Sequence, residues 1–486
     1  MMVKNLMLIF IALLWSGFTN FLSAQENMVD KKLWSLKDCV DYALANNLNV
    51  HRSEFNVESI RLNYTQSRLS SLPSANASGA IGYNWGRGID PVTNQFISSQ
   101  RNNFVSLGVN GSVTLFNGFR IRNSIRQTQK DHQASGFDLE KSKNDVTLEI
   151  INLFINVLFN KELDQNARLQ LNSSQEQLDR TKKQVSAGAL SRSFELNAEA
   201  QVATNELNVV NTENQLALSL LQLQQALQLP VTDDFDVITP EIEADILLLE
   251  QSREEIFGIS SEILPEMKSA KLKVESSYYA VKASRGNLYP RLSLNGSINS
   301  NYSSASKTRF VKDGGFTQDS NSGLFVSGSN TPVYMLRPTG SFQDVYLFND
   351  QIGDNLYKSL NIQLVIPLFN GYANRLNMRR SMIANEQAKI NLKETTNLVR
   401  QNVELAFNNA KASYKTFHSA QKQVAALEEA FRMINQRYEI GAASFVEYQV
   451  AENDYFRALS DLARARFDYI FKKKILDFYQ GNPIEF

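Results

Sequence analysis

The sequence predicts a mixed α/β membrane protein made of two internal repeats, in which β-strands and very long helices alternate. Three observations support this prediction: an apolar leader at the N-terminus, the tetrapeptide Leu-Phe-Asn-Gly occurring twice, and long alternating strands followed by helices almost free of helix breakers. Four such strands are too few to close a barrel in a bilayer, so we expect several identical chains to share one.

We expect export, because residues 1–24 have the features of a secretory signal peptide. Lys4 precedes an unbroken apolar run over residues 6–15, and small residues then lead to polar Gln25. This run is too short to span a bilayer as a helix. Cys39 does not follow the expected cleavage point, so a lipid anchor there is disfavoured. No later segment has about 18 consecutive apolar residues, which leaves a soluble periplasmic, secreted or β-barrel protein.

The composition argues against an enzyme and against nucleic acid as a partner. Removing Lys4 with the leader leaves 49 of the 50 basic residues against 50 acidic ones, a net charge of −1. A single cysteine excludes an internal disulfide, and the scattered His51, His132 and His418 cannot assemble a cysteine- or histidine-rich metal site within one subunit. There is no glycine-rich phosphate loop, G-x-S-x-G or H-E-x-x-H motif, so we expect no catalytic residues, no metal and no cofactor.

A repeat organises the chain. Leu-Phe-Asn-Gly occupies 115–118 and again, 253 residues later, 368–371, and Gly188 corresponds to Gly441 at the same offset. Four apolar positions also correspond: Val146, Ile150, Leu153 and Val157 with Val399, Val403, Ala406 and Ala410. Self-similarity at a fixed offset indicates duplicated structural units.

The two copies differ mainly in one loop. Before the strands the offset is 217, since Pro73 corresponds to Pro290. We therefore predict copies over about 33–229 and 250–486 and assign the extra 36 residues of the second copy to a surface loop at 305–356.

Four runs alternate apolar and small polar residues with a period of two, as strands do. Their apolar positions are Ala75, Ala77, Ile81, Tyr83 and Trp85; Val105, Leu107, Val109, Val113 and Leu115; Leu292, Leu294 and Ile298; and Leu360, Ile362, Leu364, Ile366 and Leu368. Each run has about 11 to 13 residues, which suits a tilted strand in a bilayer, and aromatic residues near the run ends fit an interfacial girdle. The opposite face of small uncharged polar residues fits a wet lumen better than a soluble sandwich.

Strands in a bilayer must close into a barrel, because an open edge leaves backbone groups unpaired in hydrocarbon. Two chains would supply eight strands around an interior filled by side chains, whereas three would supply twelve and leave room for a channel. If the protein is a conduit, at least three chains are therefore needed to leave an open interior.

Two helices of 69 residues are predicted, over 119–187 and 372–440. Neither contains proline, and Gly136 is the single glycine. At about 1.5 Å per residue each would be roughly 100 Å long. Apolar residues at i, i+4, i+7 and i+11 indicate coiled-coil packing. A soluble coiled-coil rod would explain the helices but not the strands.

Glycines mark both ends of these helices. At the far ends, Gly188 and Gly441 are expected to start turns that reverse the chain into antiparallel hairpins, with return helices ending near Pro230 and Gly481. At the near ends, glycine permits the bend from strand into helix and asparagine can cap the new helix. The residues of these strand-to-helix turns are Asn117, Gly118, Asn370 and Gly371.

In order and duplicated spacing, these features resemble the TolC-type outer-membrane efflux protein family (outer membrane factors). The resemblance covers nearly the whole mature chain, from "LWSLKDCVDYALANNLNV" at 33–50 onward. It implies a homotrimer whose four strands per protomer form a 12-stranded outer-membrane barrel continued by a long periplasmic α-helical coiled-coil tunnel. It further implies a passive exit duct of a tripartite efflux or type I secretion system in a Gram-negative-type bacterium. The implied partners are a periplasmic adaptor (membrane fusion protein), an inner-membrane transporter and outer-membrane lipids, but not nucleic acid.

The resemblance also implies roles for residues near the helix tips. Adaptor contacts are expected at Gly188, Ala189, Leu190, Gly441, Ala442 and Ala443. Glu447 occupies the acidic gate position of the family, and Glu195 is one residue out of step with it. Val450 stands where the family has a second acidic residue. A solvated coiled-coil face is the alternative interpretation of both glutamates.

The resulting division of the chain has seven parts. They are the signal peptide 1–24, an N-terminal periplasmic helical segment 25–72, the first strand pair 73–118, the first helical hairpin 119–230, an equatorial linker 231–289, the second strand pair 290–371 with its extracellular loop 305–356, and the second helical hairpin 372–486. A surface-displayed trimeric adhesin is disfavoured because strands precede helices in both copies, and a soluble periplasmic enzyme lacks a catalytic constellation. The exported substrate is not indicated.

Overall fold

The computed structural model describes most of the chain after the leader. The described residues are 33–86, 88–89, 96–97, 101–230, 235–239, 251–319 and 323–482. The predicted signal peptide lies outside them. None of the helices in these ranges combines the length and the apolar character that crossing a membrane requires. The chain divides into two compact units: one contains the residues up to Ser53, Leu139–Leu264 and those from Asn397 on, and the other contains Glu54–Asp138 and Pro265–Thr396.

The helices occur in pairs of nearly equal length, as the repeat predicts. The pairs are α2 (Leu36–Asn46) with α6 (Arg253–Ile263), α3 (Leu48–Leu69) with α7 (Pro265–Gly286), α4 (Arg120–Ser186) with α9 (Ala373–Glu439), and α5 (Arg192–Ala226) with α10 (Phe445–Gln480). Local signals match within a pair: Ser35 starts α2 and Ser252 starts α6 with the same capping box, closed by Asp38 and Glu255 respectively. The two-copy prediction is confirmed at the level of secondary structure.

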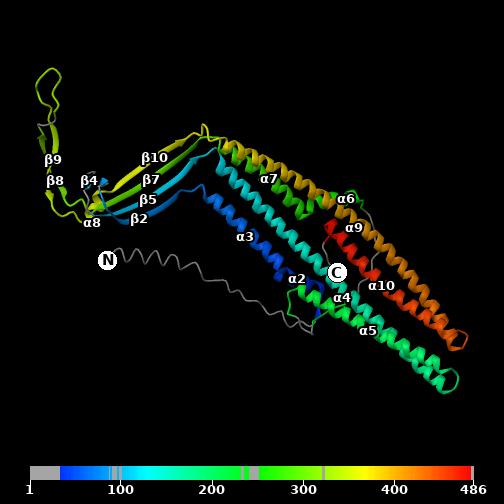
Figure 1. The fold of residues 1–486 in the computed structure, drawn as a ribbon. Helices are drawn as coiled ribbons and strands as arrows, with labels where there is room; N and C mark the ends of the chain where they lie inside the picture. The colour runs from blue at the N-terminus through cyan, green and yellow to red at the C-terminus, as the bar shows by residue number, and fades with distance from the viewer. Residues whose placement is uncertain are drawn as a thin grey trace. The chain divides into compact units, whose positions relative to one another are not determined.

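In one unit, the four predicted strands form a single antiparallel sheet (Figure 1). They are β2 (Ser74–Asn84), β5 (Asn102–Phe116), β7 (Arg291–Ser303) and β10 (Tyr357–Val365), in the spatial order β10-β7-β5-β2. The register aligns the predicted apolar positions, since Val113 lies opposite Leu294 and Leu294 lies opposite Ile362. One face of the sheet is therefore apolar, as the alternation predicts.

The opposite face is a ladder of small polar side chains. Ser74 and Ser112 hydroxyls lie 3.1 Å apart, Ser297 and Ser359 hydroxyls 2.7 Å apart, and the Asn295 amide donates to Asn361 at 3.2 Å. These cross-strand bonds satisfy part of the hydrogen-bonding capacity of the face, which carries one charged residue, Arg291, at the end of β7.

The structure shortens two predicted strands, of which the first, β2, ends at Asn84 before Trp85, and it adds elements that the sequence does not predict. Alternation at Ile366 and Leu368 was expected to continue the last strand, but β10 ends at Val365 because Pro367 has no N–H for the ladder. Within loop 305–356, β8 (Arg309–Asp319) and β9 (Met335–Gln343) form a hairpin, and α8 (Phe348–Asp354) follows. A short pair, β3 (Gly88–Ile89) with β4 (Phe96–Ile97), lies between β2 and β5 in the chain.

Helix α8 is tied to the sheet through one buried amide. Gln351, 1% exposed, accepts from the Ser303 backbone at 3.0 Å and donates to the carbonyls of Ser303 at 3.2 Å and Ser306 at 3.1 Å. A buried amide with all these partners holds a fixed geometry.

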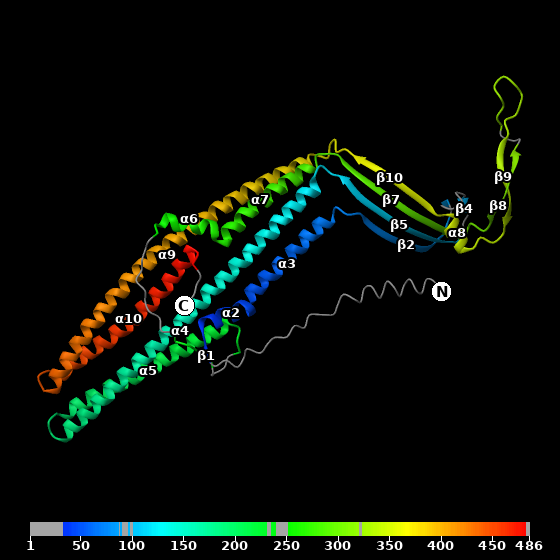
Figure 2. The same cartoon turned by 180° about the vertical axis from the view of Figure 1, so that it is seen from behind.

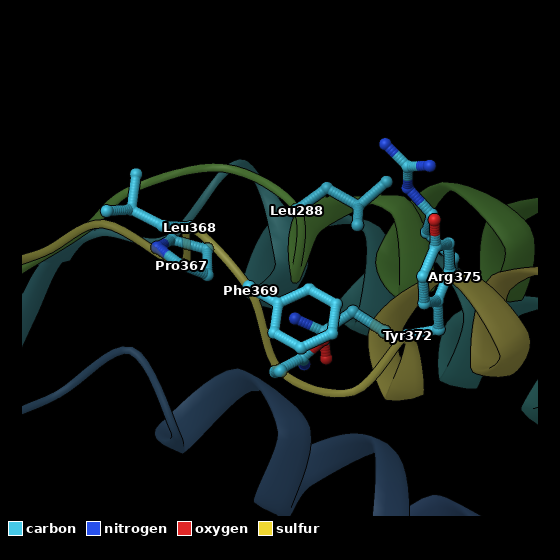
Figure 3. A pocket seen from close by; sticks show the side chains of 8 residues that line it. Leu288, Pro367, Leu368, Phe369, Tyr372 and Arg375 are labelled. Atoms are coloured by element: carbon cyan, nitrogen blue, oxygen red, sulfur yellow. The ribbon is translucent and has the colours of Figure 1, made fainter.

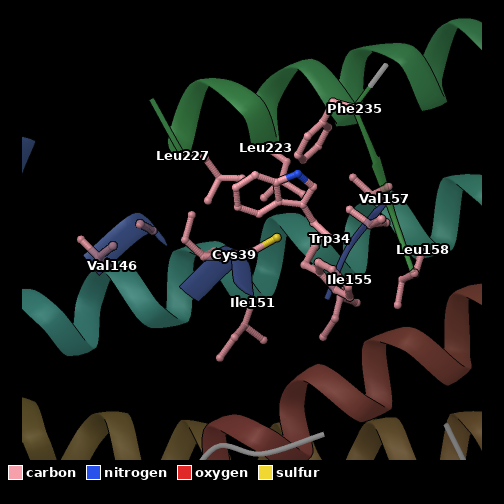
Figure 4. Close-up of a cluster of buried hydrophobic side chains, with 14 of the residues drawn as sticks. Trp34, Cys39, Val146, Ile151, Ile155, Val157, Leu158, Leu223, Leu227 and Phe235 are labelled. Carbon is pink, nitrogen blue, oxygen red and sulfur yellow. The ribbon is translucent and has the colours of Figure 1, made fainter. Parts of the chain in front are cut away.

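In the other unit, paired helices enclose the largest apolar cluster. Figures 1 and 2 show α5 running back along α4 and α10 along α9. The cluster joins α2, α4, α5 and the parallel pair of β1 (Leu33–Trp34) and β6 (Asp236–Val237). Trp34, Cys39 and Phe235 pack there against Ile151, Val157 and Leu223 (Figure 4). The cluster anchors the N-terminal segment to the first helical hairpin.

Candidate functional site

Each strand-to-helix turn contains two consecutive residues in the left-handed region. φ is 65° at Gly118 and 63° at Phe119 in the first copy, and 62° at both Gly371 and Tyr372 in the second. Glycine adopts this conformation freely, whereas a residue with a Cβ pays about 1–2 kcal/mol. The sequence predicts the two glycines but not the strained residue after each of them.

Aromatic contacts support both turns in the same way. The Phe116 and Phe119 rings meet edge to face at 5.5 Å between centroids, and the Phe369 and Tyr372 rings do so at 5.9 Å. Edge-to-face pairs contribute about 0.5–1.5 kcal/mol beyond the burial of their area. This contribution offsets the backbone strain at Phe119 and Tyr372.

Both predicted asparagines accept a hydrogen bond at the backbone carbonyl, and Asn117 also accepts one at its side-chain oxygen. The Asn117 side-chain oxygen accepts from the Ile121 N–H at 3.4 Å, a long bond, and its backbone carbonyl accepts from Arg120 at 3.2 Å. In the second copy the Asn370 carbonyl accepts from Ala373 at 3.2 Å. The backbone bond is the feature that both turns share.

Two pockets adjoin these turns. The first, of about 270 Å³, is lined by Leu288, Pro367, Leu368, Phe369, Tyr372 and Arg375, among others (Figure 3). The second, of about 230 Å³, is lined by Asn117, Arg120, Asn287 and Arg291, among others. Pro367 and Asn374 line both pockets, so the two are neighbours.

At the opposite ends of the long helices, both tips form Schellman motifs. The N–H of Gly188 donates to Val185 at 3.0 Å, and that of Ala189 to Gln184 at 2.9 Å. Gly441 and Ala442 repeat these bonds to Tyr438 and Arg437 at 3.0 and 2.7 Å. φ is 74° at Gly188 and 75° at Gly441, which explains glycine at these positions. Leu190 and Ala443 follow directly, before the helices α5 and α10 begin.

The two candidate gate glutamates differ in their local bonding. Glu447 closes a capping box with Ser444, whose backbone N–H donates to the carboxylate at 2.7 Å. This backbone bond, followed by the side-chain bond of Ser444, lowers the pKa of Glu447. Glu195 lies one position further along α5, whose N-cap Ser191 makes no side-chain cap bond. One residue corresponds to a rotation of about 100° around a helix. Relative to the N-cap of its own helix, Glu195 therefore points in a different direction from Glu447.

Helices α5 and α10, which follow the two tip turns, contact each other through an aromatic pair. Phe194 of α5 and Phe445 of α10 lie edge to face, 6.3 Å between centroids. The structure thus brings the two tips into contact, while the predicted turn residues belong to the other unit.

A polar network that the sequence did not predict joins the two helical hairpins near their tips. Glu452 of α10 is 2% exposed, accepts a short hydrogen bond from Ser173 of α4, and accepts from the Tyr448 hydroxyl at 3.3 Å. Alongside it, Gln170 donates to Asn453 at 3.0 Å and Gln177 to Tyr438 at 2.8 Å. Apart from the bond between Tyr448 and Glu452, which are neighbours on α10, these bonds connect residues more than 250 positions apart.

Burial raises the pKa values of two groups in this network. Burial raises the pKa of Glu452 above its ordinary value of 4.5, and raises that of Tyr448 to about 12, helped by the neighbouring Glu452. A signal for Glu452 was present in the sequence: Phe445, Tyr448 and Glu452 follow coiled-coil spacing, and a glutamate at such a core position is unusual.

Comparisons with known proteins of similar sequence and of similar structure agree with one another. The sequence profile of the outer membrane efflux protein family matches residues 39–228 and 262–472, one stretch in each repeat. Nodulation protein T of Rhizobium leguminosarum bv. viciae is 23% identical over 443 residues, covering 89% of this chain and 78% of that protein.

Solved structures show the same fold. CusC matches with a TM-score of 0.72 at 16% identity, covering 96% of each chain. The outer membrane channel CmeC of Campylobacter jejuni also matches with a TM-score of 0.72 at 16% identity, covering 96% of this chain and 94% of its own.

Proposed function

The chain belongs to the outer membrane efflux protein family, and from this premise we propose that three copies of it assemble into one channel. Members are outer-membrane exit ducts of efflux systems that extend into the periplasm, and this chain is such a channel and not an enzyme. Channels of this family work with adaptor proteins and inner-membrane pumps.

The trimer proposal rests on the two unpaired edges of the sheet and on its exposed apolar face. β10 and β2 are its two edges, and apolar side chains such as Ile362 and Leu364 are 67% and 59% exposed in the single chain. Pairing β10 of one copy with β2 of the next continues the antiparallel order, because β10 and β2 run in opposite directions. Repetition closes the edges, places the apolar face in lipid and encloses the polar ladder. Three copies give about twelve strands, enough for an aqueous interior.

The remaining assignments follow the same proposal. The strand pairs of 73–118 and 290–371 lie in the membrane, loop 305–356 lies outside the cell, and the hairpins of 119–230 and 372–486 form the periplasmic tunnel. The turns at Gly188 and Gly441 contact the adaptor. Their exposed backbones and small neighbours offer a surface on which another helical hairpin can pack closely.

Glu447 is the proposed gate residue, with Glu195 as a second candidate. Three symmetry-related carboxylates near a narrow axis repel one another and attract cations. The lowered pKa of Glu447 favours the charged form at neutral pH. The duct itself consumes no energy, and its efflux or secretion partners supply the substrate.

Cross-linking between strand edges tests the assembly. We would introduce Ser78→Cys on β2 and Asn361→Cys on β10 in the full chain, and treat membranes with a long thiol cross-linker. Cys39 is fully buried and should not react. The expected product is a ladder that ends at three chains, absent from either single variant. A ladder ending at two chains, or no ladder, contradicts the trimer.

A further inference from the structure

The polar face of the sheet carries a single charged side chain, that of Arg291 at the start of β7. Arg291 pairs with Val365 of β10, and the alternation places both on the face of Ser293 and Gln363. The remaining positions of this face on β2, β5, β7 and β10 carry no carboxylate. In the proposed channel this face lines the interior, so the copies of Arg291 form a ring at one level. Rings of arginine or lysine are found in pores that conduct anions.

No carboxylate in the neighbouring chain segments balances this charge. The strand register brings four segments to this end of the sheet, because Ser74 pairs with Ser112 and Arg291 pairs with Val365. The segments contain several arginines but neither aspartate nor glutamate, and they comprise residues 62–73, 112–130, 276–300 and 355–385. A single sign of charge between walls of low dielectric constant focuses the electric field and concentrates ions of the opposite sign.

A second arginine lines the same pocket as Arg291. This pocket of about 230 Å³ is lined by Arg291, by Arg120 at the first residue of α4, and by Tyr289 and Asn374, among others. Both arginines are exposed, and within the described ranges neither forms an ion pair with a carboxylate. Guanidinium groups bind carboxylate and phosphate oxygens through pairs of parallel hydrogen bonds. Two of them in one pocket can therefore hold one anionic group.

The backbone around the pocket is held in place before any ligand binds. A Cβ added at Gly286 would lie 2.8 Å from the Cβ of Arg120 and 3.0 Å from the Gly118 carbonyl oxygen. The start of α4 is therefore packed directly against the end of α7. Asn374 of α9 donates to the Asn287 carbonyl at 2.8 Å, which fixes the α7–β7 turn. Preorganised groups lose little freedom on binding, so more of the interaction energy contributes to affinity.

We propose that Arg291 and Arg120 form an anion-binding site on the channel wall, repeated in each protomer, at the junction of the strands and the long helices. The site binds the carboxylate, sulfonate or phosphate group of a transported molecule and favours anions over cations at this level. The inference rests on the proposed function, because the polar face must be enclosed for the ring to act on ions in transit. It adds a substrate class to that function, namely molecules that carry at least one such acidic group.

Planar bilayer recordings of the full-length protein test the site. The ratio of chloride to potassium permeability follows from the reversal potential in a KCl gradient, and pyrophosphate serves as the anionic blocker. Arg291→Gln should lower the permeability ratio roughly threefold and weaken the pyrophosphate block roughly tenfold, because it removes the charge of the whole ring. Arg120→Gln should weaken the block with a smaller effect on the ratio. All variants keep the same tips, so the acidic gate proposed at Glu447 contributes equally to each.

Two further variants separate the charge from the fold. Arg291→Lys keeps the charge but not the paired hydrogen bonds, so it should retain the permeability ratio and lose part of the pyrophosphate block. Lys358→Gln is the matched control, because Lys358 lies on β10 opposite Ile298, on the apolar face that the proposed channel turns towards lipid. This variant should conduct and be blocked like the wild type.

Thiol modification introduces the charge after the channel has formed. Arg291→Cys channels should regain the wild-type permeability ratio on reaction with a methanethiosulfonate reagent that carries a trimethylammonium group. The sulfonate analogue of the reagent should shift the ratio further towards cations. Cys39 is fully buried and should not react. Wild-type channels treated in the same way are the control, and their ratio should not change.

Three results would overturn the proposal. An unchanged ratio and an unchanged block in both glutamine variants would remove the site, and an equal change in Lys358→Gln would assign the effect to general surface charge. Loss of channels in Arg291→Gln and Arg291→Lys alike would identify Arg291 as a structural contact. Wild-type protein that forms no channels would contradict the proposed function together with the site, whereas wild-type channels whose variants lack these shifts would remove the site alone.

Discussion

The two Leu-Phe-Asn-Gly turns have nearly the same backbone but different surroundings. A Cβ at Gly118 would lie 2.5 Å from the Gly286 carbonyl oxygen, whereas a Cβ at Gly371 would meet nothing within 4 Å. Both glycines have positive φ, so substitution by alanine carries the same backbone cost of about 1–2 kcal/mol at either site.

Gly118→Ala should therefore lower the thermal stability of the protein far more than Gly371→Ala. The additional loss comes from separating α4 from the α7–β7 turn. Circular dichroism melting in detergent measures both variants, and Gly371→Ala is the matched control. Equal shifts in Tm for the two variants would contradict the steric explanation.

Glu447→Gln should change single-channel conductance, or its block by divalent cations, in planar bilayers. The amide keeps an oxygen for the Ser444 N–H but removes the charge. Glu255→Gln is the matched control, because Glu255 closes the same kind of capping box at α6, away from the tips. Identical recordings for wild type and Glu447→Gln would remove the gate assignment.

Between elements, the polar network at Glu452 ties α10 to α4. Because burial raises the pKa of Glu452 in the folded protein, the folded state holds this proton more tightly than the unfolded chain. Its favourable contribution is complete below the ordinary pKa of 4.5 and is lost as pH rises from there through the raised value.

Glu452→Gln should therefore flatten the decrease in Tm that the wild type shows as pH rises through this window. Burial also raises the pKa values of Glu162 and Asp477. These two groups contribute equally to the pH dependence of Tm in the wild type and in Glu452→Gln, so they cancel when the two Tm curves are subtracted. Parallel curves for the two proteins would show that Glu452 does not titrate between the folded and unfolded states.

The tip turns act as elements whose geometry depends on one left-handed residue. Gly441→Pro removes the N–H that donates to Tyr438 and requires φ near −65°, against the observed 75°. We expect it to abolish export while oligomers persist, measured by the drug susceptibility of the host cell and by native gels. Gly441→Asn, which tolerates positive φ, should retain export. An unchanged susceptibility profile with Gly441→Pro would refute the role of the tip.

For the whole molecule, the two faces of the sheet should respond in opposite ways to charge. Ile362 and Gln363 are neighbours on β10 and lie on the apolar and polar faces respectively. Ile362→Arg should reduce insertion, because arginine on the lipid face near the midplane costs about 2–4 kcal/mol, whereas Gln363→Arg should insert and alter conductance. Heat-modifiable migration on gels measures insertion. Equal insertion of both variants would contradict the assignment of faces.

Local patterns in the sequence already determined a large part of this protein. Period-two alternation assigned the faces of the four strands, and the register of Val113, Leu294 and Ile362 agrees with it. The duplicated glycines predicted where the long helices begin and end, since chain reversal at positive φ depends on residues within one turn of the helix. The order of these elements also carried the family resemblance, which the profile match confirms.

Only the tertiary structure showed which distant residues meet. Ser173 and Glu452 are 279 positions apart, and their bond depends on the packing of two hairpins that no local pattern encodes. The same holds for Asn117, Arg120 and Arg291, which line one pocket only because the register brings the ends of β5 and β7 together. Spacing in a sequence sets the direction of a side chain from its own helix or strand, whereas its partner is set by the packing of the elements.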